Sequence, residues 1–333
     1  MTIDRRTLIG STIGLAMASV ARAQDAPTPY VPGTGTAAWP PGEHFRLWPG
    51  SPPGAPNPLP KNDFTVNGKF RELWLRGVSE PMVAVYRPAK PDGRAVLSIP
   101  GGGYGFVSIE NEGIDVAKAL TPHGITVFVL AYRLPGEGWA NRWDVPLQDA
   151  QRAMRLIRSR ASEFGIDPAK LGIVGFSAGG HLGADLATGH ADPVYAPIDA
   201  ADRLSARPAY AGLVYPLVSF TTAGFNPGSE EMLLGGNTDA AILARHTPAD
   251  RITAETPPIF LVHAIDDGTV PIAQSLLAIE KCRAAKVPVE AHLFEKGGHG
   301  FGALHLPVDA PGRLWPDIFA RWTAARAEVP LAA

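Results

Sequence analysis

Short apolar runs alternate with helical stretches from about residue 72 onward, and this alternation constrains the fold more than any other feature of the sequence. We predict strands over seven of these runs: 81–86, 95–99, 126–130, 171–174, 212–215, 258–263 and 289–294. Continuous apolar runs are typical of strands that are buried on both faces. The pattern therefore predicts an α/β fold, with a mainly parallel, twisted sheet and helices on both faces.

One helix is predicted with a clear apolar face. Its apolar residues recur at alternating three- and four-residue steps: Leu147, Ala150, Met154, Ile157, Ala161 and Phe164. This spacing predicts a helix over residues 146–164 with one stripe packed on the sheet. Four arginines fall largely on the other side: Arg152, Arg155, Arg158 and Arg160. We expect them to form a solvated face.

The first 23 residues have the anatomy of a signal peptide. A charged stretch at 2–6 precedes an uncharged apolar run at 8–20 and a small-residue site that ends at Ala23. The run is shorter than the roughly 20 residues that a membrane-spanning helix needs. We therefore expect export to the periplasm or beyond, cleavage near Ala23 and no stable membrane insertion. Arg5 and Arg6 resemble a twin-arginine signal, from which Asp4 and Leu8 depart.

The rest of the composition indicates a protein stabilised by its core. The net charge is −2, and no block of like charges offers a surface for nucleic acid. Cys282 is the only cysteine, so an intramolecular disulfide is excluded. No pair of histidines or carboxylates has metal-ligand spacing on one helix face, and we expect neither a metal nor another cofactor. After cleavage, about 310 residues suffice for one large domain.

Two segments depart from the alternating pattern. Residues 24–71 form a proline-rich arm, with eleven prolines between Ala26 and Pro60, and its 45–50 stretch is apolar enough to dock on the body formed by 72–333. Residues 219–255 carry Gly, Pro, Asn and a short helical pattern around 240–244. This second segment is either an insertion that covers the edge of the sheet or a decorated connection between a strand and a helix.

The residues around Ser177 predict a catalytic nucleophile. The predicted strand 171–174 leads into Gly175-Phe176-Ser177-Ala178-Gly179, and a helical stretch follows. In this strand, turn and helix context, G-x-S-x-G presents a serine on a strained turn, and small neighbours are a steric requirement there. The N-terminal N–H groups of the helix would face an oxyanion formed at Ser177.

A serine nucleophile needs a base and a group that orients the base, and in this fold they follow in the order acid, then histidine. Asp266 and Asp267 follow the predicted strand 258–263, at the edge of the sheet where active sites form. His299 lies in a glycine-flanked loop after the next strand. We predict His299 as the base in preference to His305, which lacks the glycine flanks.

A glycine run after strand 95–99 predicts an oxyanion hole. Three glycines, Gly101 to Gly103, allow backbone N–H groups to approach a reacting carbonyl. We predict that the N–H groups of Gly102, Gly103 and Ala178 form the hole. Tyr104 follows, and we expect it to border the acyl pocket as a substrate contact. A phosphate cradle is the competing interpretation, but the lysine of a P-loop and the dinucleotide spacing are both missing.

Several of these motifs together resemble bacterial acetylxylan-esterase-like α/β-hydrolases, which are related to hormone-sensitive-lipase-type esterases. The residues that carry the resemblance are Leu47-Trp48-Pro49-Gly50, Pro100-Gly101-Gly102-Gly103-Tyr104, Tyr132-Arg133-Leu134-Pro135, Gly175–His181 and His263–Pro271. The resemblance implies an α/β-hydrolase fold and Asp267, which precedes x-x-Val-Pro, as the catalytic acid. Pro100 stands where the lipase-like branch usually has histidine, which favours the acetylesterase-like branch.

The resemblance also implies a reaction. It implies a serine carboxylic ester hydrolase that removes acetyl or other short acyl groups, commonly from sugars or plant polysaccharides, through an acyl-enzyme. Its partner would be a small ester or an acetylated saccharide. A lipase-like carboxylesterase that acts on small lipophilic esters is the first alternative. A serine peptidase is the second, although residues 24–71 are too few for the N-terminal propeller of the related peptidases.

Overall fold

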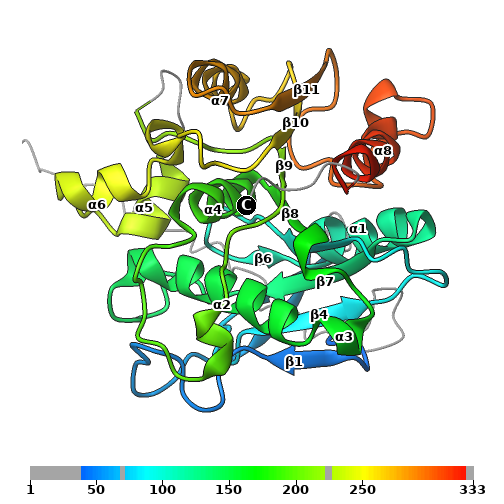
Figure 1. Ribbon diagram of the computed structural model, residues 1–333. Helices are drawn as coiled ribbons and strands as arrows, with labels where there is room; N and C mark the ends of the chain where they lie inside the picture. Colours follow the sequence, from blue (N-terminus) through cyan, green and yellow to red (C-terminus); the bar gives the residue numbers. More distant parts are fainter. Residues whose placement is uncertain (1–38, 68–71, 222–226, 328–333) are drawn as a thin grey trace, which may run out of the picture.

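The computed structural model describes residues 39–67, 72–221 and 227–327. The predicted signal peptide and the first part of the proline-rich arm lie outside these residues. The main sheet has eight strands in the order β1-β4-β7-β5-β8-β9-β10-β11 (Figure 1). Their bounds are β1 His44–Arg46, β4 Met82–Tyr86, β5 Ala95–Ile99, β7 Thr126–Ala131, β8 Leu171–Phe176, β9 Ala211–Val214, β10 Ile259–Ala264 and β11 Val289–Phe294. All neighbours from β7 to β11 are parallel, whereas β4 is antiparallel to both β1 and β7.

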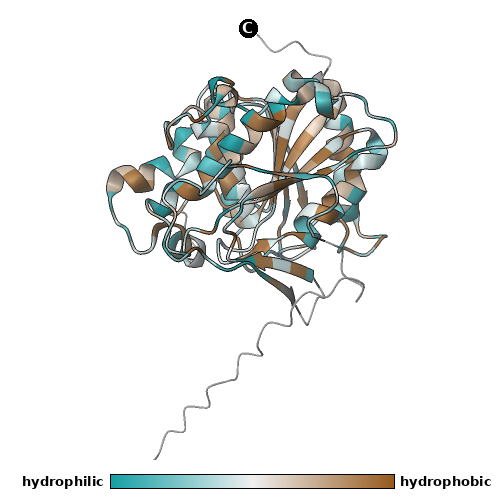
Figure 2. Ribbon diagram, turned by 90° about the horizontal axis from the view of Figure 1, so that it is seen from below, coloured by the Kyte–Doolittle hydropathy of each residue, from teal (hydrophilic) through white to brown (hydrophobic). Residues whose placement is uncertain are grey.

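The mainly parallel order predicted from the sequence is confirmed, and all seven predicted strands are present within two residues of their expected bounds. Every residue of β5, β7, β8, β9 and β10 is buried, as continuous apolar runs predict. β11 is the exception, because it is an edge strand and its residues are only half-buried or exposed. Figure 2 shows the apolar strands enclosed between the helices.

Eight α-helices are found among the described residues. Their bounds are α1 Asp115–Leu120, α2 Val145–Ser159, α3 Ala161–Phe164, α4 Ser177–Gly189, α5 Gly228–Leu234, α6 Ala240–Arg245, α7 Ala273–Ala284 and α8 Trp315–Ala327. In Figure 1, α2 and α4 lie on one side of the sheet, and α1 and α8 lie on the other. None of the described helices is both long and apolar enough to cross a lipid bilayer.

The predicted helix over 146–164 is divided at Arg160 into α2 and α3. The expectation that its arginines form a solvated face is wrong for Arg152, whose side chain is only 2% exposed. Its guanidinium donates to the Leu47 carbonyl oxygen at 3.0 Å and pairs with Asp202 at 3.0 Å and with Asp199. The polar side of the helix is covered because the N-terminal arm and the segment after α4 both pack on it.

The arm is joined to the body by a strand and a tryptophan. β1 extends the main sheet beside β4, and Leu47 and Trp48 follow it into the core. The Trp48 indole N–H donates to Asp149 at 2.8 Å. Asp149 also forms a fully buried ion pair with Arg133 at 2.8 Å. The 45–50 stretch, expected to dock on the body, therefore takes part in a buried polar network.

A second sheet was not predicted from the sequence. β2 Asp63–Asn67, β3 Glu72–Arg76 and β6 Val107–Ser108 form three antiparallel strands in the order β2-β3-β6. The Trp74 and Phe106 rings stack with their centroids 3.9 Å apart. Since β6 begins at Val107, a few residues after the glycine run at 101–103, this small sheet lies next to the loop that is predicted to hold the oxyanion.

Candidate active site

Ser177 is the first residue of α4 and directly follows β8, at the carboxyl edge of the main sheet. Its φ of 52° is in the left-handed region, where non-glycine residues are strained. A Cβ at Gly175 would lie 2.4 Å from the carbonyl oxygen of Gly179, and a Cβ at Gly179 would lie 2.1 Å from that of Ile99. Both distances are far below van der Waals contact. The two glycines of the G-x-S-x-G motif are therefore required by the close approach of backbone around the serine.

Ser177, His299 and Asp267 form one chain of hydrogen bonds. Ser177 Oγ is 2.9 Å from His299 Nε2, and His299 Nδ1 is 2.7 Å from Asp267 Oδ2. The three residues follow β8, β11 and β10, so the parallel sheet brings them to one edge. Asp266 faces elsewhere and accepts a hydrogen bond from the Gly298 N–H at 2.9 Å. The geometry thus pairs Asp267, and not Asp266, with the histidine.

Asp267 is held as an ionised carboxylate. Its Oδ1 accepts hydrogen bonds from the N–H groups of Thr269 at 2.8 Å and Val270 at 2.9 Å, and its Oδ2 lies 3.3 Å from His263 Nε2. Burial acts to raise the pKa of Asp267, but the hydrogen bonds to His263 and His299 outweigh it and hold that pKa well below its usual range. An ionised Asp267 keeps the proton on His299 Nδ1, which leaves Nε2 free to accept the serine proton.

The glycine run after β5 forms the loop beside Ser177. Gly102 has φ 124° and Gly103 has φ 60°, and a Cβ at Gly102 would lie 2.1 Å from the Phe106 carbonyl oxygen. Only glycine fits at Gly102, because its conformation is rare for other residues and the space is already filled. Gly102 and Gly103 line the same cavity as Ser177, and Ala178 is the second residue of α4. The three predicted oxyanion donors therefore lie around the serine.

Sequence reasoning missed two further polar residues of the site, Glu112 and Tyr215. The Glu112 carboxylate accepts hydrogen bonds from the Gly101 N–H at 2.6 Å and from the Tyr215 hydroxyl at 2.8 Å. The Tyr215 hydroxyl also accepts from the Gly302 N–H at 2.9 Å, and the Tyr215 ring lies 4.9 Å from that of His299. Glu112 thus connects the glycine loop, through Tyr215, to the segment that carries the base.

No spacing signal in the sequence points to Glu112. It belongs to a polar stretch that resembles an ordinary loop but folds as a single π-helical turn, Glu110–Ile114. Burial raises the pKa of Glu112, although its hydrogen bonds to Tyr215 and Gly101 act in the opposite direction. A buried carboxyl group without hydrogen-bond donors would be costly, so these contacts are part of what makes its position tolerable.

A cavity of about 760 Å³ opens above Ser177 and His299. One wall is formed by mostly apolar residues after β9, from α5 and after β10: Leu217, Ser229, Met232, Val270 and Pro271. The other wall carries Glu72, Trp74, Phe106, Asn111 and His305. Residues 228–232 of the 219–255 segment thus border the site. Residues 222–226 of this segment lie outside the described residues.

The expectation that the Tyr104 side chain borders the acyl pocket is wrong. Tyr104 is only 1% exposed, does not line the cavity, and its hydroxyl lies 2.7 Å from His181 Nδ1. The backbone explains the difference, because a φ of 62° at Tyr104 turns the side chain from the glycine loop toward α4. Tyr104 therefore links the predicted oxyanion loop to the helix that follows the nucleophile.

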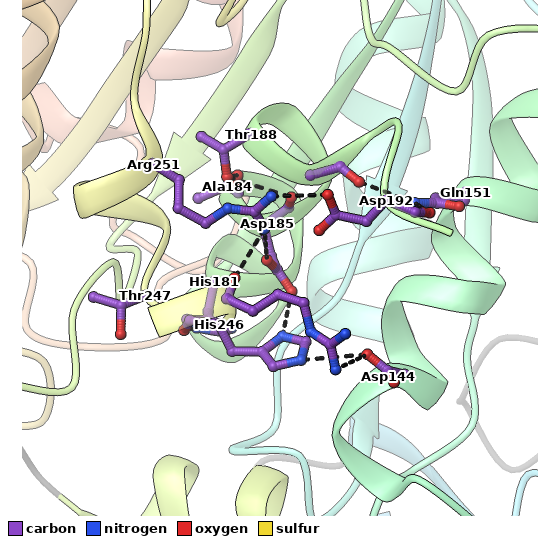
Figure 3. A network of polar contacts seen from close by, with 12 residues as sticks. Asp144, Gln151, His181, Ala184, Asp185, Thr188, Asp192, His246, Thr247 and Arg251 are labelled. Atoms are coloured by element: carbon purple, nitrogen blue, oxygen red, sulfur yellow. Dashed lines mark hydrogen bonds and ion pairs between the residues drawn. The ribbon is translucent and has the colours of Figure 1, made fainter. Parts of the chain in front are cut away.

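His181 continues into a buried polar network (Figure 3). Its Nε2 lies 2.9 Å from the His246 carbonyl oxygen. The His246 ring lies between two carboxylates, with Nδ1 2.8 Å from Asp185 and Nε2 3.5 Å from Asp144. Burial acts to lower the pKa of His246, but Asp185 and Asp144 raise it to about 9. The ion pair between His246 and Asp185 joins the end of α6 to α4.

His263 and His305 have other partners. His263 is fully buried in β10, and its Nδ1 lies 2.8 Å from Ser275 Oγ. His305 lies on the cavity wall between Glu72 and Asp115. Across residues 39–67, 72–221 and 227–327, no group of three or more His, Cys, Asp or Glu side chains is arranged to hold a metal ion.

A mainly parallel eight-stranded sheet, with a serine on the turn after a central strand and an aspartate and a histidine after later strands, defines the α/β-hydrolase class. Within that class, the chain belongs to the BD-FAE family, whose family model matches residues 83–282.

Several esterases and xylan-degrading enzymes are similar to this chain in sequence or structure, at 30–35% identity. An acetylxylan esterase of Xylanibacter ruminicola is 30% identical over 72% of this chain, and endo-1,4-beta-xylanase B of Butyrivibrio fibrisolvens is 35% identical over 62% of it. The chain spans only 46% and 32% of those two relatives. A crystal structure of an acetyl ester-xyloside bifunctional hydrolase from Caldicellulosiruptor lactoaceticus matches with a TM-score of 0.69 and 30% identity. That match covers 87% of this chain and 98% of the other.

Proposed function

We propose that this protein is a serine carboxylic ester hydrolase that releases acetyl or other short acyl groups from carbohydrate-type substrates. The observation that carries the proposal is the hydrogen-bonded chain from Ser177 through His299 to Asp267, which opens into a cavity of about 760 Å³. A nucleophile, a base and an orienting acid are the groups that acyl transfer requires.

In the proposed reaction, Ser177 Oγ attacks the ester carbonyl carbon while His299 Nε2 takes the hydroxyl proton. Asp267 holds the imidazole by its Nδ1–H and stabilises the imidazolium. The N–H groups of Gly102, Gly103 and Ala178 stabilise the oxyanion, and one such donor typically contributes about 10²–10³ in rate. The imidazolium then returns the proton to the leaving alcohol. Water, deprotonated by His299, releases the acid and regenerates Ser177.

The proposed alcohol moiety is a sugar. Two of the similar proteins are named for acetyl esters of xylan or xylosides, which supports a sugar acetate as substrate. The cavity is also lined by the polar side chains of Glu72, Asn111 and His305, and a carboxylate there can accept hydrogen bonds from the hydroxyl groups of such an alcohol.

The proposal is tested with purified wild type and Ser177→Ala. Wild type should hydrolyse 4-nitrophenyl acetate and release acetate from acetylated xylan, with lower turnover of longer acyl esters. Ser177→Ala should lose about 10⁴-fold or more of this activity. Wild-type turnover by Ser177→Ala would contradict the nucleophile assignment. Preference for long acyl chains would indicate a lipase-like enzyme, and cleavage of peptide amides would indicate a peptidase.

We further propose that the protein is exported and cleaved after Ala23. The charged stretch, the apolar run and the small-residue site support this proposal. N-terminal sequencing of protein recovered from the periplasm or medium should give Gln24 as the first residue. Intact protein confined to the cytoplasm would contradict it.

A further inference from the structure

The cavity has a polar wall that the proposed chemistry does not use. We call the five residues Glu72, Trp74, Phe106, Asn111 and His305 the Glu72 wall. They come from the small sheet, from the π-helical turn after it and from the segment beyond His299. These parts are far apart in the sequence, and the fold brings them together only at the mouth of the site.

The centre of the Glu72 wall is a carboxylate with unused acceptor capacity. Glu72 Oε1 lies 3.3 Å from His305 Nδ1, and Glu72 Oε2 accepts a hydrogen bond from the Trp74 indole N–H at 3.1 Å. A carboxylate has about four acceptor sites, so room remains for hydroxyl donors. The Glu72 side chain is about one tenth exposed and lines the cavity, so a donor on a substrate would reach it from that side.

Both acidic and basic groups surround the Glu72 carboxylate. His305 Nε2 lies 3.3 Å from Asp115, so one imidazole lies between two carboxylates. The hydrogen bond to Asp115 raises the pKa of His305, burial opposes this, and Glu72 adds to the rise. Glu110 and Glu112 lie in the adjoining turn, and the Glu110 carboxylate accepts from the Leu73 N–H at 2.9 Å. Part of this negative charge is balanced by Lys118, which pairs with Asp115 at 2.8 Å, and by Arg76, whose guanidinium lies 5.5 Å from the centre of the Trp74 ring.

Aromatic and amide groups extend the Glu72 wall. The Trp74 and Phe106 rings are stacked, and both line the cavity. Aromatic rings offer an apolar surface to the C–H faces of a sugar while the polar groups beside them bind hydroxyls. Asn111 is 3% exposed and also lines the cavity, and its Oδ1 has no hydrogen-bond partner among the residues that the structure describes.

The position of the Glu72 wall relative to the base identifies which half of the ester it would contact. Asn111 Nδ2 donates to the carbonyl oxygen of Gly300, the residue after His299, at 2.8 Å. The leaving alcohol must receive its proton from His299, so it departs on the side of the base. The contact of Asn111 with Gly300 therefore places the Glu72 wall on the side of the base.

From these observations we infer that the Glu72 wall is the subsite for the alcohol moiety and selects a neutral, polyhydroxylated alcohol such as a pyranose ring. Glu72 accepts hydrogen bonds from sugar hydroxyls, Trp74 and Phe106 pack on the ring, and Asn111 fixes the wall to the segment that carries the base. The Glu72 carboxylate disfavours an anionic alcohol such as a uronic acid, because a second carboxylate placed directly against it is repelled. This inference rests on the proposed function, since it requires Ser177 and His299 to process an ester.

The test compares substrates that differ only in the alcohol. Values of kcat/KM are measured for an acetylated methyl xyloside, an acetylated methyl glucuronide and 4-nitrophenyl acetate. Wild type should prefer the xyloside ester over the glucuronide ester. Glu72→Gln should lower the ratio of xyloside to 4-nitrophenyl acetate turnover about tenfold, because a hydrogen bond to a charged acceptor is replaced by a weaker one. The ratio of kcat/KM for the xyloside ester to kcat/KM for the glucuronide ester should also be smaller in Glu72→Gln than in wild type.

Two further variants keep the test decisive. Glu290→Gln is the matched control, because Glu290 forms a similar pair with His292 at 3.0 Å on β11, outside the cavity. Its substrate ratio should stay at the wild-type value. Trp74→Leu probes the Glu72 wall independently and should lower the same ratio. Thermal unfolding checks that each variant is folded.

The outcomes distinguish the two proposals. An unchanged substrate ratio in both Glu72→Gln and Trp74→Leu would overturn the subsite, and so would equal wild-type activity on the neutral and anionic esters. Wild type that hydrolyses 4-nitrophenyl acetate but no sugar acetate would also overturn it, while leaving the esterase proposal intact. Failure of the esterase proposal would instead appear as no ester hydrolysis by wild type, or as full activity in Ser177→Ala.

Discussion

Protonated His246 should stabilise the folded state at neutral pH. This stabilisation should be lost at alkaline pH, where the ring loses its proton. Its ring is fully buried beside Asp185 and Asp144, which raise its pKa from 6.5 to about 9. A pKa that is higher in the folded than in the unfolded chain contributes stability that is complete below 6.5 and disappears as the pH rises through 9. At about 1.4 kcal/mol per tenfold change in proton affinity, the contribution is about 3 kcal/mol.

The assay is urea unfolding of wild type and His246→Gln from about pH 6 to about pH 10, followed by intrinsic fluorescence. The free-energy difference between the two proteins should be about 3 kcal/mol larger at the acidic end than at the basic end. Other titrating groups, His305 included, contribute equally to both proteins, so their contributions cancel in the difference between the two free energies of unfolding. His44→Gln, which removes an exposed histidine, should follow the wild-type curve. If the free energies of unfolding of wild type and His246→Gln differ by the same amount at every pH, protonated His246 does not stabilise the folded state.

Three further substitutions test the site itself. Asp267→Asn should lower kcat on 4-nitrophenyl acetate by about 10⁴-fold, because the histidine loses its orienting charge, whereas Asp266→Asn should stay within about twofold; the reverse order would refute the assignment. Glu112→Gln should lower kcat about tenfold or more with little change in KM, because the variant weakens the bonds that position the glycine loop; an effect on KM alone would contradict a positioning role. Tyr104→Phe should reduce the free energy of unfolding, measured with urea, by about 1–3 kcal/mol, because the buried His181 Nδ1 loses its partner; unchanged stability would show that this bond is replaced.

The parts of the structure that follow local rules were predictable from the sequence. The buried strands are continuous apolar runs, and the turn at Ser177 requires glycines two residues away on each side. Asp267 and His299 follow strands, and the parallel order brings strand ends to one edge. Each of these features depends on a few neighbouring residues or on a general property of parallel sheets.

The parts that were missed depend on partners far along the chain. Arg152 has the spacing of a solvated residue, but its carbonyl acceptor, Leu47, lies 105 residues earlier. Glu112 meets the Tyr215 hydroxyl 103 residues later, and no local pattern marks either residue. Tyr104 was placed in the pocket because it follows the glycines, whereas its backbone conformation turns it toward α4. Sequence spacing indicates which residues are adjacent on one element, but not which element covers them.

The strand and tryptophan that join the arm to the body have a practical consequence for anyone who shortens this protein. From the sequence alone, residue 72 is the obvious first residue for a shortened protein, because the alternating pattern starts there. Such a truncation would delete β1, uncover the edge of β4 and remove the indole that donates to Asp149, leaving a buried ion pair open to water. We expect the truncated protein to aggregate. A shortened protein should therefore begin before Trp39, so that β1 and Trp48 are kept.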